Sequence, residues 1–130
     1  MRRAFWVIAI ISSVALLTHL HGTRAAENKN VSIPLAVART VDFDHDVKSI
    51  LGISCVQCHG GGHSKGGFRM DSKATFFKGG ETGPAVVERD SSKSLLIQLV
   101  SGVEDDSIMP KKGRRLTAEE SGVLRAWIDQ

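Results

Sequence analysis

The chain has only two cysteines, and a histidine directly follows the second. Cys55, Cys58 and His59 form a C-x-x-C-H motif within 130 residues. A disulfide between cysteines this close would stabilise little, because the stabilisation grows with the length of the closed loop. The spacing is that of c-type haem attachment, in which two thiols add to the vinyl groups of a porphyrin and the histidine binds its iron. The motif therefore predicts one covalent haem c on Cys55 and Cys58, with His59 as the proximal iron ligand.

Three other uses of the motif remain open. Zinc could take both cysteines with His59 and either His63 or His45, although Cys58 and His59 are adjacent and no second C-x-x-C completes the site. A thioredoxin-like dithiol would need a βαβ setting, which the sequence lacks. A structural disulfide without a redox role is the third alternative.

If His59 binds iron on one side, the other side needs a ligand from a distant part of the chain. Met109 lies fifty residues downstream and precedes Pro110. A thioether is a suitable soft donor and a proline stiffens its loop, so Met109 is the predicted distal ligand. Its alternative role is to fill the core, as methionine often does. The rival ligands are Met70, His63 and His45.

Two further features belong to the predicted site. The carbonyl of Pro84 is expected to accept the Nδ1 proton of His59 and fix the ring, with an ordinary turn proline as the alternative. A basic cluster follows Met109, where the haem edge is expected to emerge. Such a cluster suits an acidic redox partner or the haem propionates, and equally a solvated surface. Its members are Lys111, Lys112, Arg114 and Arg115.

The first 25 residues have the pattern of a secretory signal peptide. Two arginines precede an apolar run over residues 4–17, which is shorter than the roughly 20 residues of a membrane span. Cleavage after Ala25 predicts an exported protein, in the periplasm or, if the segment stays as an anchor, on the outer side of the cytoplasmic membrane. Removing residues 1–25 leaves 14 basic and 14 acidic residues. The composition therefore gives no argument for nucleic-acid binding.

The remaining sequence predicts a flexible N-terminal arm over residues 26–40 and one domain over residues 41–130. Apolar residues recur with helical spacing in several segments, and no segment alternates long enough to predict a strand. Thr117 and Glu120 form a capping box, and Gly52 is expected to end the first helix. The sequence thus predicts a small all-α domain, wrapped around the haem. The predicted helices cover residues 41–51, 72–78, 92–100 and 117–130.

Several motifs occur in a specific order along residues 41–130. They include Cys55-x-x-Cys58-His59-Gly60, Gly66-Gly67-Phe68-Arg69-Met70-Asp71, Gly83-Pro84, Met109-Pro110, Thr117-x-x-Glu120 and Trp127-Ile128. In this combination the chain resembles the planctomycete-type cytochrome c domain. The resemblance implies a class I cytochrome c-like helical fold with one haem c, Met109 as distal ligand, and the first helix packed against the last. The family often has a second proline after Met-Pro, where this chain has Lys111.

The predicted function is one-electron transfer through a His/Met-ligated haem, by a carrier rather than an enzyme, with a redox partner protein. A haem enzyme or gas-binding module with an open distal site is the first alternative. A firmly held Met109 would close that site, and no distal His and Arg pair is apparent. A zinc-bound or disulfide-stabilised binding module without redox chemistry is the second alternative.

Overall fold

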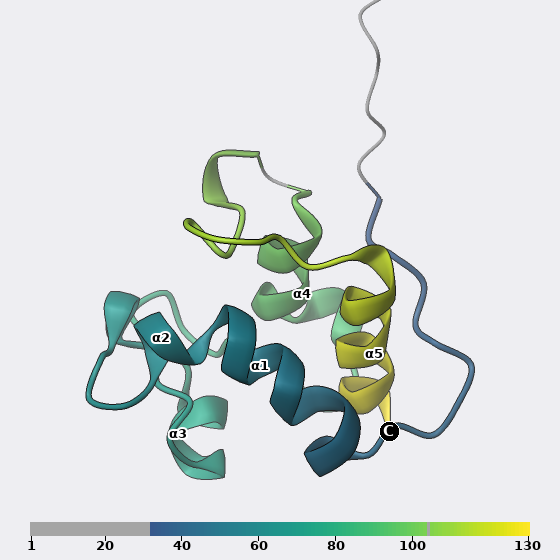
Figure 1. Ribbon diagram of the computed structural model, residues 1–130, viewed down its shortest axis with the longest axis horizontal. Helices are drawn as coiled ribbons and strands as arrows, with labels where there is room; N and C mark the ends of the chain where they lie inside the picture. Colours follow the sequence, from purple (N-terminus) through teal and green to yellow (C-terminus); the bar gives the residue numbers. More distant parts are fainter. Residues whose placement is uncertain (1–31, 104) are drawn as a thin grey trace, which may run out of the picture.

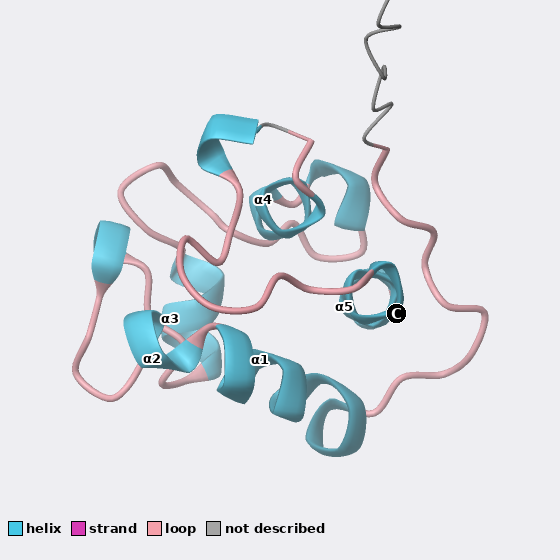
Figure 2. Cartoon of the chain, turned by 45° about the horizontal axis from the view of Figure 1, so that its top comes forward, coloured by secondary structure: helices cyan, strands magenta, loops and turns pink. Residues whose placement is uncertain are grey.

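The computed structural model describes residues 32–103 and 105–130, so the predicted signal peptide lies outside the described residues. This part contains helices and no strand, and its one β pairing is an isolated bridge between Gly80 and Gly83. The prediction of an all-α fold is confirmed (Figure 2). None of the described helices is long and apolar enough to cross a membrane. The elements are η1 (Phe43–Val47), α1 (Lys48–Ser54), α2 (Val56–His59), η2 (Lys65–Gly67), α3 (Lys73–Lys78), η3 (Ser91–Lys93), α4 (Leu95–Ser101), η4 (Asp105–Ser107) and α5 (Ala118–Asp129).

The first helical segment runs past its predicted end. Asp42 caps η1 by accepting a hydrogen bond from the His45 amide at 2.9 Å, and α1 continues to Ser54. The prediction that Gly52 ends this helix is wrong. A glycine ends a helix when the backbone turns left-handed, whereas an interior glycine costs only about 1 kcal/mol. The additional residues carry the helix up to Cys55.

The middle helices follow their predicted boundaries in part. α3 begins after Ser72, whose side chain forms a reciprocal cap with Thr75, and ends at Gly79 with a φ of 80°. The helix predicted over residues 92–100 is divided into η3 and α4 by Ser94. The Ser94 hydroxyl accepts a hydrogen bond from the Val87 amide at 2.9 Å, and its backbone is extended. Such local side-chain hydrogen bonds compete with helix formation.

α5 begins as the capping box predicts. The Thr117 side chain accepts from the Glu120 amide, and the Glu120 carboxylate accepts from the Thr117 amide. The described part of the predicted arm runs beside α5 (Figure 1). There the Val37 amide donates to the Gly122 carbonyl at 3.1 Å, and the Arg125 guanidinium donates to the Pro34 carbonyl. Residues 32–40 are therefore held against the domain.

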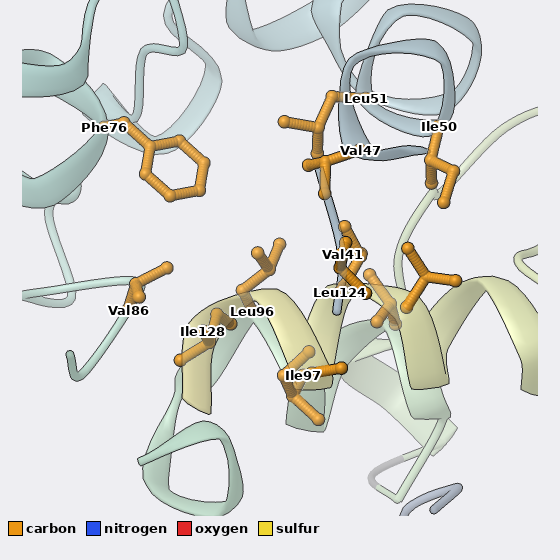
Figure 3. Packing of buried hydrophobic residues seen from close by; sticks show 13 residues of the cluster. Val41, Val47, Ile50, Leu51, Phe76, Val86, Leu96, Ile97, Leu124 and Ile128 are labelled. Carbon is orange, nitrogen blue, oxygen red and sulfur yellow. The ribbon is translucent and has the colours of Figure 1, made fainter. Parts of the chain in front are cut away.

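The hydrophobic core forms where α1, α4 and α5 meet, and Phe76 of α3 and Val86 extend it to one side (Figure 3). Val47, Ile97 and Leu124 are fully buried. The first helical segment packs against the last, as the resemblance implies. The centroids of the Phe43 and Trp127 rings, one from each segment, are 5.5 Å apart. This packing fixes α1, and with it the position of the C-x-x-C-H motif at the end of α1.

Candidate functional site

A cavity of about 990 Å³ lies between the C-x-x-C-H segment, α4 and the loop that precedes α5. Its volume is at the upper end of the roughly 300–1,000 Å³ that ligand pockets in proteins occupy. Apolar side chains from several elements form much of its wall, and the motif residues add sulfur and imidazole groups. The apolar lining residues are Ile53, Phe68, Ala85, Leu95, Leu96, Leu99 and Val100.

The cysteines and the histidine lie on one helical turn. Cys55 caps α2, and its carbonyl accepts from the amides of Cys58 and His59 at 3.1 and 3.0 Å. All three side chains line the cavity, and both thiols are free. Burial, with a smaller contribution from Cys58, raises the pKa of the Cys55 thiol from 9.0 to about 11. Cys55 is therefore a protonated thiol at neutral pH.

The imidazole of His59 is oriented by Phe68. The Nδ1 atom lies 3.3 Å from the Phe68 carbonyl oxygen, and the two rings are 5.3 Å apart. A proton on Nδ1 that is shared with this carbonyl leaves Nε2 free to bind a metal. The carbonyl of Pro84 was one of two roles predicted for this proline, and in the structure the carbonyl that faces Nδ1 belongs to Phe68 instead.

Gly83 and Ala85 line the cavity on either side of Pro84. No sequence signal identifies Phe68 as the acceptor, because every residue has a carbonyl. The loop that folds back onto α2 selects it, through a hydrogen bond from the Met70 amide to the His59 carbonyl at 2.6 Å. The second contact of Phe68, ring against ring, depends on the same loop position.

Met109 reaches the same cavity from the loop between α4 and α5. Its amide donates to the Leu99 carbonyl at 2.9 Å, which ties the loop to α4. Met70 and His63 also line the cavity, so the structure keeps these rival ligands close to the motif. His45 is elsewhere: its side chain is 89% exposed and pairs with Asp42 in η1.

Basic side chains surround part of the cavity. We call Lys65, Lys111, Lys112 and Arg114 the basic rim, since all four line the cavity. Among the residues that the structure describes, Glu81 is the single acidic residue in that lining. Three members of the rim belong to the basic cluster predicted from the sequence, and the fourth, Lys65, was missed because it lies outside that cluster, just before Gly66 and Gly67. An anionic group at the cavity mouth would be attracted by this excess of positive charge.

The residues of the cavity fit a covalently attached haem. Two thiols and an imidazole on one turn face an apolar space, and a thioether faces it from another segment. The Ser54 hydroxyl lines this space and is buried, with no hydrogen-bond partner in the described part of the chain. Zinc is disfavoured, because no three His, Cys, Asp or Glu side chains among residues 32–103 and 105–130 gather closely enough to hold a metal ion.

The helical fold and this site define a small domain whose C-x-x-C-H turn lines an apolar cavity, an arrangement typical of cytochrome c-like proteins. The family model described as planctomycete cytochrome C matches residues 55–113, which confirms the resemblance stated from the motifs. A cytochrome c domain implies covalent haem c, and Cys55 and Cys58 fit its attachment motif. No match to the chain was found among curated proteins or among solved structures.

Proposed function

We propose that the protein is an exported monohaem c-type cytochrome that transfers single electrons through a His/Met-ligated haem. The observation that supports this most directly is the meeting of Cys55, Cys58, His59 and Met109 on one cavity. These residues come from segments fifty positions apart in sequence, so local structure alone does not bring them together. Export is supported by the family, whose cytochrome c domains are typically exported.

In this proposal, Cys55 and Cys58 hold the haem by two thioether bonds. A bound haem supplies iron that cycles between the ferrous and ferric states. His59 binds the iron through Nε2, and the Phe68 carbonyl keeps the proton on Nδ1 and holds the ring in place. The two cysteines would thus attach the haem, while His59, oriented by the Phe68 carbonyl, would bind its iron.

In this proposal, Met109 would be the second protein ligand of the iron. Its thioether raises the reduction potential relative to a harder ligand, and a bound sulfur keeps oxygen and peroxide from the iron. Leu95, Leu96 and Leu99 give the cavity an apolar wall. These features favour electron transfer over the enzymatic or gas-binding alternative.

The basic rim is proposed as the surface that meets the redox partner. Lys65, Lys111 and Lys112 line the cavity through which electrons would enter and leave, and Glu81 is the one acidic residue that the described part of the chain adds to this lining. A partner with an acidic surface would be steered to this mouth by long-range attraction.

The decisive experiment compares the wild type with Met109→Ala and Met70→Ala, each expressed with a haem-attachment system. We expect the denatured wild type to have the mass of the polypeptide plus one haem. Met109→Ala should keep this mass and lose the weak thioether-to-iron absorption band at the red end of the ferric spectrum. Met70→Ala, which removes the rival methionine from the same cavity, should keep both.

A polypeptide without haem mass would contradict the proposed function as a whole. Retention of the band in Met109→Ala and its loss in Met70→Ala would transfer the ligand role to Met70. Rapid carbon monoxide binding by the ferrous wild type would show an open distal site and favour the gas-binding alternative.

A further inference from the structure

Arg114 joins the loop that carries Met109 to the start of α5. Its two terminal nitrogens donate to the two carboxylate oxygens of Glu120 at 2.8 and 2.7 Å. This parallel pair of charge-assisted hydrogen bonds fixes orientation as well as distance. The ion pair lowers the pKa of Glu120 from 4.5 to about 2, so its carboxylate is charged at neutral pH. We call the Arg114–Glu120 pair the clasp.

The helix end that holds the clasp is itself rigid. Glu120 lies in the first turn of α5, and its carboxylate also accepts from the Thr117 amide at 2.8 Å. One carboxylate therefore caps α5 and binds the loop at the same time. Arg114 lines the cavity, so this arrangement ties the cavity wall to the helix.

Two further hydrogen bonds hold the part of the loop that the structure describes. The Met109 amide donates to the Leu99 carbonyl at 2.9 Å, and the Lys111 ammonium donates to the Asp106 carbonyl at 2.6 Å. Gly113, with a φ of 85°, adds a flexible position just before Arg114. The clasp, directly after Gly113, is thus the contact that joins this part of the loop to α5.

We propose that Arg114 and Glu120 are positioning residues for Met109, and that the clasp controls how readily its thioether leaves the haem iron. This inference rests on the proposed function, since it takes Met109 as the distal ligand. Exposed ion pairs contribute little to global stability, and the side chains of Arg114 and Glu120 are 51% and 24% exposed. The ion pair is instead expected to change the free energy of opening the Met109 loop. Opening one loop costs less free energy than unfolding the whole domain, so a weak interaction has a larger relative effect there.

The test measures the departure of Met109 directly. Imidazole is mixed with the ferric haem protein, and the loss of the thioether-to-iron band is followed until the rate no longer rises with imidazole concentration. This limiting rate reports loop opening. We expect Arg114→Gln and Glu120→Gln each to raise it about two- to fivefold, the range expected from an exposed ion pair. The double variant should be no faster than either single variant, because both remove the same interaction.

Three controls separate positioning from a general effect. Glu120→Gln keeps the capping box, because glutamine serves at that position too. Arg114→Lys restores the charge and should return part of the wild-type rate. Arg115→Gln removes the neighbouring exposed charge and should leave the rate unchanged. The hydrogen-exchange rate of the Met109 amide gives a readout that does not depend on iron, and it should rise only in the clasp variants.

Two outcomes would overturn the inference and leave the proposed function standing. One is an unchanged limiting rate in both clasp variants, and the other is an equal acceleration in Arg115→Gln. If Met109→Ala keeps the thioether-to-iron band, Met109 is not the ligand, and the inference fails together with that part of the proposed function.

Discussion

Two glycines of this protein show how differently the same residue acts at two positions. Gly52 lies inside α1, and a Cβ added there would meet no atom within 4 Å. Gly79 ends α3 with a φ of 80°, and a Cβ added there would lie 2.6 Å from the Pro84 Cα. Only the second position needs glycine, because it combines a left-handed backbone with a close approach of another segment.

Alanine substitutions should separate these two positions. Gly79→Ala is expected to lower the free energy of unfolding by at least about 2 kcal/mol, since the left-handed conformation costs roughly 1–2 kcal/mol and a backbone clash adds to it. Gly52→Ala should raise the free energy of unfolding by about 0.5–1 kcal/mol, the helix-interior difference between the residues. Guanidinium unfolding of the haem-loaded variants measures both. Equal stability of the two variants would contradict this reading of Gly79.

At the scale of the elements, α5 connects three separate parts of the protein. Its first turn binds the Met109 loop through Glu120, and its middle binds the N-terminal arm through Gly122 and Arg125. Its last turns contribute Trp127 and Ile128 to the packing against other helices. Gly122 permits the close approach of the arm, since a Cβ there would lie 2.5 Å from the Leu35 carbonyl oxygen.

Gly122→Ala should therefore detach the arm without unfolding the domain. Alanine favours the helix by about 1 kcal/mol, whereas its methyl group occupies the space of the Leu35 carbonyl. We expect the Val37 amide, which bonds to the Gly122 carbonyl, to exchange faster by on the order of tenfold. Hydrogen exchange followed by NMR measures this, with Gly52→Ala as a matched helix-glycine control. Unchanged protection of Val37 would show that the arm tolerates the added methyl group.

At the scale of the whole molecule, the large cavity limits what the polypeptide can do alone. The core of α1, α4 and α5 lies beside an opening of about 990 Å³. The apolar side chains that line the cavity lose dispersion contacts on one side when nothing fills it, which lowers the stability of the fold. A covalent haem would supply the missing apolar volume to a domain that is otherwise small.

We expect the double variant Cys55→Ser/Cys58→Ser, which cannot attach haem through thioethers, to be poorly folded. Near-UV circular dichroism should be weak and thermal unfolding should lack a cooperative transition, while part of the far-UV helical signal persists. The haem-loaded wild type should unfold cooperatively under the same conditions. A sharp, wild-type-like transition in the double variant would contradict the structural role assigned to the haem.

The basic rim gives a second prediction at this scale. Electron transfer from the reduced protein to anionic hexacyanoferrate(III) should slow several-fold as ionic strength rises from about 0.01 to 0.1 M, because the screening length falls from about 30 to 10 Å. A cationic cobalt(III) complex should show the opposite trend. The double variant Lys111→Gln/Lys112→Gln should weaken this salt dependence. The control Lys48→Gln should not, because Lys48 of α1 is paired with Asp44 of η1 and is not part of the rim. Equal salt dependence for both oxidants would contradict steering by the rim.

Local interactions explain what the sequence predicted correctly. The capping box of Thr117 and Glu120, the stop at Gly79 and the lack of strands in residues 32–103 and 105–130 each depend on residues within a few positions of one another. The C-x-x-C-H motif is equally local, since one turn presents both thiols and the imidazole. The planctomycete cytochrome C model, which matches residues 55–113, includes this motif.

Contacts between distant segments were decided only by the tertiary structure. The sequence did not show that Phe68 faces His59, that Lys65 joins the basic rim, or that the arm lies on α5. The clasp belongs with these contacts, because Arg114 could have met several acidic residues, and the path of the loop selects Glu120. The physical reason is the same in each case. The sequence determines the chemistry of each side chain, whereas the residues that surround it in space depend on how the whole chain packs.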